Sequence, residues 1–167
     1  MPEHPEAPYT FERVEYDDAR AVELRRVMDL DMNERYNDGI NSPSDPAVVK
    51  ALTVNPADVQ ATVLVIDADQ TPIGHAALRL LRGDWEVKRV IVAGDQRGRG
   101  VGRALMTELE HIARAGGAVR LILQTGNKQP EAVALYTRLG YTPIAVYEPY
   151  IEAIPFSLCY EKPLPRA

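Results

Sequence analysis

Hydrophobic and polar positions repeat with two different periods in the first part of the chain. Residues 9–16 (YTFERVEY) alternate with a period of two, which is typical of a half-buried strand. Residues 18–36 have a plausible helix cap in Asp17 or Asp18, and their apolar side chains recur at helical spacing: Ala21, Leu24, Val27, Met28, Met32. A short second helix is predicted from Asp45, because Pro46 suits the first helical position.

The pattern then changes to strands. Residues 61–67 and 73–81 flank a polar turn and read as a hairpin, and residues 85–93 form the next strand. After a glycine-rich loop the order becomes a helix, a strand, a helix and a last strand, at residues 101–115, 119–124, 130–140 and 156–164. The nearly continuous apolar run of the strand at 119–124 suits a central position beside the strand at 85–93.

These elements predict an α/β (mixed α+β) fold. The central sheet is expected to be mixed and mostly antiparallel, with one βαβ unit and helices on both faces. Residues 1–8 contain three prolines without periodicity and are expected to form a flexible leader. Residues 9–167 are expected to form a single domain, since 167 residues with 46% hydrophobic content suffice for one core.

Charge and cysteine content narrow the function classes. The only cysteine, Cys159, excludes an internal disulfide, and no apolar run reaches the roughly 20 residues that span a bilayer, so a soluble cytoplasmic protein without a membrane role is expected. Residues 1–75 carry 15 acidic and 6 basic side chains, whereas residues 76–167 carry 9 and 13. The basic half suits an anionic ligand or is an ordinary solvated surface, and an acidic chain disfavours a nucleic-acid partner.

The stretch DQRGRGVGRALMTELE (95–110) carries the strongest chemical signal. It joins the end of an apolar strand to a helix, so the loop amides and the positive end of the helix dipole form an anion site. Gly98, Gly100 and Gly102 allow close approach of a ligand to the backbone, while Arg97, Arg99 and Arg103 add charge, and a diphosphate fits such a loop. A simple strand-to-helix turn is the competing interpretation.

Two familiar phosphate-binding motifs do not match this stretch. A Walker A loop ends in Gly-Lys-Ser/Thr, which is absent here. A dinucleotide fingerprint has glycine at its sixth place, where this chain has Arg103, and the next strand ends in Gln124 instead of an acidic residue.

The run R-G-x-G-x-G (97–102) after an apolar strand, followed by A-x-x-L-Y-x-x-x-G-Y (132–141), resembles the GCN5-related N-acetyltransferase (GNAT) superfamily. The resemblance is specific from about residue 85 to 145. It implies acetyl-CoA as the acetyl donor, with its pyrophosphate on the amides of residues 97–102, Val101 included, and its pantetheine paired with the strand at Val90, Ile91 and Val92. The family often has asparagine where this chain has Gln129, which retains a side-chain amide on a longer arm.

The reaction needs a base for the amine, an acid near the leaving sulfur and a donor at the carbonyl oxygen. Strict alternation would place Glu86 on the same face as Val90 and Val92, and in some family members a glutamate at this offset is the base, directly or through water. The competing interpretation is a surface carboxylate near Lys88 or Arg89. The resemblance also implies that Tyr136 protonates the sulfur, against a role in packing, and that the N–H near Val92 is the oxyanion donor.

The acceptor side is less recognisable. The family's first helix and the loop after it line the acceptor pocket, so Glu34, Arg35 and Tyr36 are candidate acceptor contacts, or else an ordinary polar helix end. Tyr147 and Tyr150 belong to a tyrosine-rich stretch that suits a wall of the same cleft. Cys159 is expected to be a buried small residue, and the scattered histidines make a metal site improbable: His4, His75, His111.

The sequence therefore predicts an N-acetyltransferase that moves an acetyl group from acetyl-CoA to a primary amine, of a small molecule, by direct attack in a ternary complex. Two alternatives stay open. One is acetylation of protein lysines or N-termini, and the other is a catalytically silent acyl-CoA-binding regulatory domain. A homodimer is common for such folds, and no metal is expected.

Overall fold

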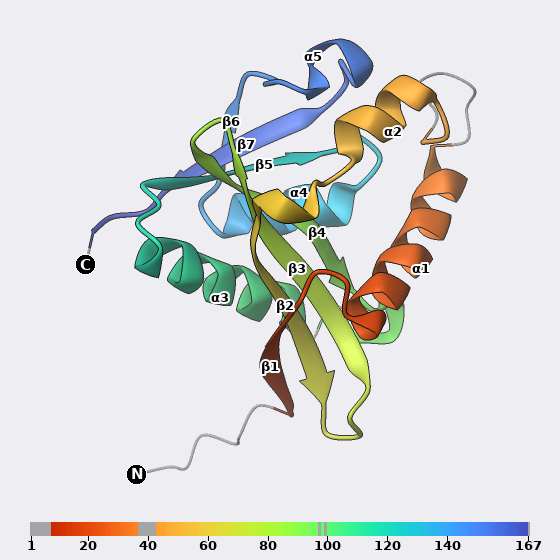
Figure 1. Cartoon of the computed structure of the whole chain (residues 1–167), viewed down its shortest axis with the longest axis vertical. Coiled ribbons are helices and arrows are strands. Elements are labelled where there is room, and N and C mark those ends of the chain that lie inside the picture. The colour runs from red at the N-terminus through yellow and green to blue at the C-terminus, as the bar shows by residue number, and fades with distance from the viewer. Residues whose placement is uncertain (1–7, 37–42, 97, 99, 167) are drawn as a thin grey trace.

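The described part of the chain is built around one twisted sheet (Figure 1). The computed structural model describes residues 8–36, 43–96, 98 and 100–166, and within these residues seven strands pair in the order β1-β2-β3-β4-β5-β7-β6. The strands are β1 (Tyr9–Val14), β2 (Val59–Asp67), β3 (Pro72–Leu81), β4 (Asp84–Val92), β5 (Arg120–Thr125), β6 (Thr142–Ile144) and β7 (Leu158–Pro163). All neighbours pair antiparallel except β4 and β5, which are parallel. The predicted mixed, mostly antiparallel sheet is thus confirmed.

Helices cover both faces of this sheet, as predicted (Figure 1). They are α1 (Ala19–Arg35), α2 (Pro46–Leu52), α3 (Val101–Ala115), α4 (Pro130–Arg138) and α5 (Tyr150–Ala153), with single 3₁₀ turns η1 (Pro56–Asp58) and η2 (Gly94–Gln96). Consecutive residues of β3 show the division. A Cβ at Gly74 would lie 3.2 Å from Leu105 of α3, whereas the ring of His75 contacts Arg25 of α1.

The helix starts follow from the sequence. The Asp18 side chain accepts a hydrogen bond from the N–H of Arg20 (2.9 Å), and Asp45 accepts one from Ala47 (2.9 Å), so both predicted caps are confirmed. The apolar face predicted for residues 101–115 lies against the sheet, with Val101, Leu105 and Leu109 buried.

The β3–β4 hairpin sets the register that matters for the site. Its two-residue loop, Arg82 and Gly83, has positive φ at both positions (52° and 87°), the geometry of a tight turn that matches the twist of the strands. The turn places Leu81 opposite Asp84 and Arg79 opposite Glu86.

Further along, the same hairpin contains a β-bulge. His75 pairs with Ile91 and Ala77 with Lys88, so Ala76 faces two residues, Arg89 and Val90. Arg89 has φ +57°, a conformation rare for a side chain with a Cβ. The extra residue reverses the alternation of side chains between the two parts of β4.

Some predictions differ from the structure at the ends of the sheet. Residues 10–13 of β1, which is an edge strand of the sheet, are all exposed, so the half-buried strand that their alternation predicted is wrong. The short elements β6 and α5 were not predicted. Residues 1–7 lie outside the described residues, so the flexible leader stays a prediction. In the part of the chain that the structure describes, no helix has the length and apolar character to cross a bilayer.

Candidate active site

The parallel strands β4 and β5 separate, so that part of β4 has no neighbouring strand on that side among the residues that the structure describes. Their pairing runs only from Trp85–Leu121 to Val87–Leu123, although β4 continues to Val92. On the other side of β4, Ala93 N–H donates to the carbonyl of Ile73 in β3 (2.9 Å). Because backbone groups alternate between the two edges of a strand, the N–H and C=O of Val92 face the open edge.

A cleft of about 810 Å³ lies along this open edge. Its described lining comes from α1, the end of β4, the glycine loop with the start of α3, and α4. Ten predicted site residues line it together: Val90, Ile91, Val92, Gly98, Gly100, Val101, Gly102, Arg103, Gln129, Tyr136. Arg97 and Arg99, predicted for the same loop, lie outside the described residues.

The glycines at the start of α3 serve two different purposes. Gly98 and Gly100 have φ +84° and +78°, and among the described residues, chain neighbours aside, no atom lies within 4 Å of the position that a Cβ would take at either residue. Their requirement is therefore conformational, and the space beside them is open to a ligand. Gly102 is needed for packing, since a Cβ there would lie 3.1 Å from Leu135 Cδ2 in α4.

The beginning of α3 fits an anionic group. Gly100 is the N-cap residue and supplies no side-chain hydrogen bond to the first helical amides. Those N–H groups and the positive end of the helix dipole lie at the cleft, and Arg103 and Arg138 line it nearby. A diphosphate needs such a combination of backbone donors and mobile positive side chains.

Tyr136 lines the cleft and also packs in the core. Its ring lies 5.8 Å from the ring of Tyr141 and 6.4 Å from that of Tyr160, in edge and tilted arrangements. Only 6% of the residue is exposed. Burial raises the pKa of the Tyr136 phenol, so the hydroxyl keeps its proton at neutral pH. The packing role of this tyrosine is therefore present in the structure, while proton donation to sulfur stays a prediction that its place in the cleft allows.

Glu86 does not lie where strict alternation predicted. The bulge at Arg89 and Val90 puts Val92 opposite Gly74 on the α3 face, whereas Glu86 lies opposite Arg79 on the other face. Glu86 is fully buried and is not among the residues that line the cleft, so the alternative of a surface carboxylate is also wrong.

The Glu86 carboxylate has a partner at each oxygen. Arg79 Nε donates to Oε1 (2.7 Å), while the hydroxyls of Tyr147 and Tyr150 donate to Oε2 (2.6 and 2.9 Å). Tyr147 is the half-buried member of this cluster, and Tyr150 is fully buried. The predicted acceptor-side residue Tyr147 thus lies directly beside Glu86, but it is not among the residues that line the cleft.

The cluster also contains two basic residues that the sequence did not predict as site residues. Arg79 and Lys88 are buried, and both donate to the Tyr150 hydroxyl (3.1 and 2.8 Å). Burial, more than any neighbouring charge, lowers the pKa of Lys88 to about 8. The sequence did contain a signal for the Arg79–Glu86 pair, because the two residues carry opposite charges at positions equally distant from the Arg82–Gly83 turn.

The end of α1 contacts the loop before α4 and does not line the cleft. Arg35 forms an ion pair with Glu131 and donates to the Lys128 carbonyl (3.4 Å). The Tyr36 hydroxyl accepts hydrogen bonds from Lys128 N–H (3.0 Å) and the Gln129 side chain (3.4 Å). Glu34 is exposed.

The residues of α1 that line the cleft instead precede this end by one to three turns: Glu23, Leu24, Val27, Met28, Asp31, Met32. Most of the predicted apolar face of α1 therefore lines a cleft, which explains why Val27 is half exposed although it belongs to that face.

Cys159 and the histidines have no place in the cleft lining. Cys159 is buried in β7, as expected, and burial raises the pKa of its thiol. His75 is buried beside Arg25, and His111 is exposed. His4 lies outside the described residues.

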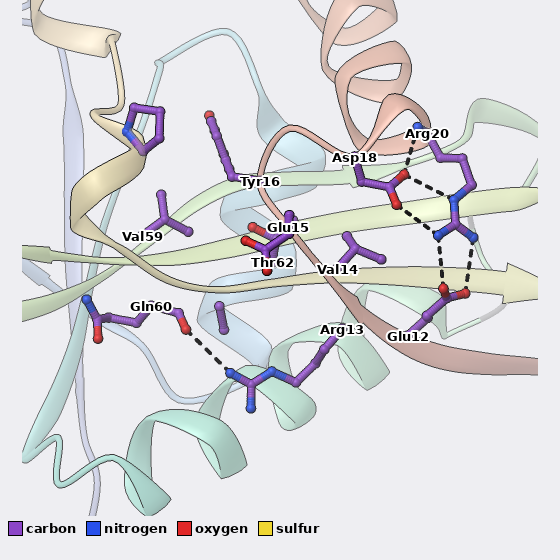
Figure 2. A pocket seen from close by; sticks show the side chains of 12 residues that line it. Glu12, Arg13, Val14, Glu15, Tyr16, Asp18, Arg20, Val59, Gln60 and Thr62 are labelled. Atoms are coloured by element: carbon purple, nitrogen blue, oxygen red, sulfur yellow. Dashed lines mark hydrogen bonds and ion pairs between the residues drawn. The ribbon is translucent and has the colours of Figure 1, made fainter.

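A second hollow of about 510 Å³ lies between β1, β2 and the start of α1 (Figure 2). Of its two arginines, Arg20 is bound by Asp18 and Glu12, and Arg13 donates to the Gln60 carbonyl (3.4 Å), as the dashed lines in Figure 2 show. Figure 2 also labels Thr62, whose buried hydroxyl has no hydrogen-bond partner among the described residues. The glycine loop, the open edge of β4 and Tyr136 are not part of this hollow, so the cleft along β4 is the candidate active site.

Curated relatives share part of their length with this chain. An "IAA acetyltransferase" from Azospirillum brasilense is 40% identical over 91 residues, which are 54% of this chain and 59% of that protein. "N-alpha-acetyltransferase 80" from Mus musculus is 38% identical over 106 residues, 62% of this chain and 30% of that protein. The chain thus matches less than two thirds of these relatives' length.

Solved structures share nearly the whole fold. A structure from Klebsiella pneumoniae, described as an acyl-CoA N-acyltransferase, superposes with a TM-score of 0.76 at 29% identity, covering 93% of this chain and 97% of that one. The PaiA N-acetyltransferase of Thermoplasma acidophilum in complex with coenzyme A has the same fold, with a TM-score of 0.65 at 14% identity over 94% of this chain and 99% of that one. The model of the Acetyltransferase (GNAT) family matches residues 24–141, from the second turn of α1 to the end of the A-x-x-L-Y-x-x-x-G-Y motif at 132–141. The chain belongs to this family.

Proposed function

We propose that the protein transfers the acetyl group of acetyl-CoA to a primary amine of a small molecule. One observation carries this proposal: the open edge of β4 and the start of α3, whose N-cap residue is a glycine, face the same cleft. An open strand edge suits an extended chain with amide groups, and a helix start suits a diphosphate. Coenzyme A carries both groups in one molecule, as pantetheine and pyrophosphate.

The proposed step is a direct attack. The amine nitrogen forms a bond to the thioester carbonyl carbon, the carbon–sulfur bond breaks, and the nitrogen loses a proton while the sulfur gains one. The N–H of Val92 on the open edge would donate to the carbonyl oxygen. The protonated phenol of Tyr136 would supply the proton to sulfur, which agrees with its raised pKa.

The contacts of Glu86 favour a route through water for the amine proton. Both carboxylate oxygens already accept hydrogen bonds, and the residue is fully buried. Of its three partners, Tyr147 is the least buried. In our proposal Tyr147 and a water molecule connect the amine to Glu86, and most of the rate comes from holding the two substrates together.

The acceptor end of the cleft suits a cationic amine with an apolar part. On α1 the cleft is lined by Leu24 and Met28 and by the acidic residues Glu23 and Asp31. Direct transfer is favoured over an acyl-enzyme, since the only cysteine is buried outside the cleft lining and its thiol has a raised pKa. The relatives are named as an IAA acetyltransferase and an N-alpha-acetyltransferase, so their names do not decide between acceptors.

A thiol-reactive dye assay tests the proposal. Acetyl-CoA is incubated with the protein and a panel of amines, amino acids, aminoglycosides and peptides with free N-termini. We expect thiol release with at least one small amine and a mass increase of one acetyl group on that amine. Release with peptides alone would instead assign a protein acetyltransferase.

A second candidate function is favoured by one observation, the sequestered Glu86. A carboxylate with all its partners inside the fold is what a catalytically silent acyl-CoA-binding domain would retain. Calorimetric binding of acetyl-CoA without turnover on any amine, together with unchanged binding in Tyr136→Phe, would support this second function.

A further inference from the structure

A buried histidine connects α1 with the bulge of β4. His75 is fully buried in β3, and its two ring nitrogens have different partners. Nε2 lies 2.9 Å from Arg25 Nη1, and Nδ1 lies 2.8 Å from the carbonyl oxygen of Arg89. Arg89 is the bulge residue with positive φ, so the histidine contacts the backbone where the alternation of β4 is reversed.

The partners fix the protonation of the ring. A guanidinium can only donate and a carbonyl oxygen can only accept, so Nε2 is unprotonated and Nδ1 carries the hydrogen. His75 is therefore neutral. Burial and the nearby charges of Arg25 and Arg89 lower its pKa to about 4, which agrees with this assignment.

The contact reaches the open edge through a single peptide unit. In a trans peptide the C=O and the following N–H point in opposite directions. By holding the Arg89 carbonyl, His75 therefore also sets the direction of the Val90 N–H. Val90 is the first residue after the bulge and lines the cleft, two positions before Val92.

Both partners of His75 are themselves bound by residues of α1 or of the segment that precedes it. Arg25 Nη2 donates to the carbonyl of Tyr16 (2.5 Å), and its guanidinium lies 3.7 Å from the centre of the Tyr16 ring. The Arg89 side chain forms an ion pair with Asp29 (2.5 Å). Residues of α1 thus fix the bulge at two points of Arg89. Asp29 binds its side chain, and Arg25 acts through His75 on its carbonyl.

We propose that His75 is a positioning residue for the donor substrate: with Arg25 it locks the Arg89–Val90 peptide, so that the edge from Val90 to Val92 is ready to pair with an extended amide chain. This inference rests on the proposed function for the identity of that chain as pantetheine. It assigns a role in substrate binding to a residue that does not line the cleft.

Two substitutions separate the contacts of the ring. His75→Asn keeps an amide N–H at the position of Nδ1 and can still donate to the Arg89 carbonyl, while His75→Gln keeps an acceptor for Arg25 and offers no donor at that position. We expect the Asn variant to bind coenzyme A within about threefold of the parent, and the Gln variant to raise the Kd and the KM for acetyl-CoA by about tenfold or more, with a smaller change in kcat.

A matched control excludes a general loss of stability. Leu64 lies opposite His75 in the neighbouring strand β2 and packs on the same face of the sheet, away from the bulge. Leu64→Ala should lower stability and leave coenzyme A binding near the parent value. Equal Kd values for the Asn and Gln variants, or a Kd in Leu64→Ala raised as much as in His75→Gln, would overturn the proposal.

A measurement on the free protein keeps the inference separate from the proposed function. Amide hydrogen exchange at Ile91 and Ala93 reports the order of the bulge without any substrate, because their N–H groups point towards β3 and that of Ala93 donates to the Ile73 carbonyl. His75→Gln should speed exchange there by about tenfold while His75→Asn does not. Arg25→Met, which leaves the imidazole in place, should speed exchange in the same direction. Unchanged exchange in both His75→Gln and Arg25→Met contradicts the positioning role even if these variants fail to bind coenzyme A.

Discussion

The two faces of the central sheet are packed by different chemistry. Towards α3 the sheet buries apolar side chains such as Val63, Val65 and Leu78 against Leu105 and Leu109. Towards α1, α2 and α5 a small apolar cluster around Leu64 is buried, beside a set of buried charged and polar groups: Arg25, His75, Arg79, Glu86, Lys88. The first face is stabilised by volume and dispersion contacts, while the second depends on each charge keeping its partner.

The candidate active site lies where these two kinds of packing meet. The bulge of β4 carries Val90 and Val92 to the α3 side and leaves Glu86 and Lys88 among the charges of the other side. A single residue inserted in one strand therefore separates the proposed substrate-binding edge from the buried carboxylate. Each of the following substitutions changes one side of this separation, either the buried charges or the proposed substrate-binding cleft.

The largest effect is expected from Glu86→Ala. The change leaves Arg79 and Lys88 buried without a carboxylate, which should lower the free energy of unfolding by about 3–5 kcal/mol. Urea unfolding monitored by circular dichroism measures it. Replacing both partners, Glu86→Met with Arg79→Met, should recover much of this loss. A double variant that loses as much as the sum of the single variants would mean that the pairing is unimportant.

A loss of about 3 kcal/mol is expected from His75 as the pH falls. Its folded-state pKa of about 4 lies below the ordinary value of 6.5, so the unfolded chain takes up the proton first. This group's contribution is fully present above pH 6.5, decreases as the pH falls towards 4, and is absent in His75→Asn. Urea unfolding of both proteins at several pH values measures the difference, and parallel pH profiles would contradict the buried neutral ring.

The glycine loop provides the third test. Gly100→Val adds a side chain to the open space at the start of α3 and should weaken coenzyme A binding by about 100-fold, as measured by calorimetry. Gly83→Val is the matched control, since Gly83 also has positive φ and no atom within 4 Å of a Cβ, but belongs to the β3–β4 turn. Equal affinity of the two variants for coenzyme A would place the pyrophosphate elsewhere.

The smallest effect is expected from Tyr136→Phe. The variant keeps the ring contacts with Tyr141 and Tyr160 and loses only the hydroxyl. Because a thiolate already leaves readily, kcat should fall by about tenfold, with little change in the KM for acetyl-CoA. Steady-state kinetics with the best amine measure both constants. A rise in KM alone would mark Tyr136 as a residue of packing and binding.

The α3 face and the glycine loop could be predicted because their signals are local. Gly98 and Gly100 stand in the sequence next to the helix that they open, and Leu105 and Leu109 repeat at helical spacing. The order of strand, helix and parallel strand followed from these neighbours alone. The short elements β6 and α5 escaped because three or four residues are too few for a periodic pattern.

The other face could not be predicted because its partners are distant in the chain. Tyr147 and Tyr150 meet Glu86 from more than 60 residues away, and Arg25 meets His75 across 50. The bulge uses Arg89, a residue without any special tendency for positive φ, so nothing in its neighbourhood predicted a reversed alternation. Because of that one inserted residue, the prediction that Glu86 shares a face with Val90 and Val92 was wrong.

The central claim is that the edge of β4 and the start of α3 hold coenzyme A together. A crystal structure of the complex tests it most directly. We predict diphosphate oxygens within hydrogen-bond distance of the main-chain nitrogens that open α3, and pantetheine amides paired with Val90 and Val92. Coenzyme A bound away from this cleft, or within it but without contact to those nitrogens, would contradict the account.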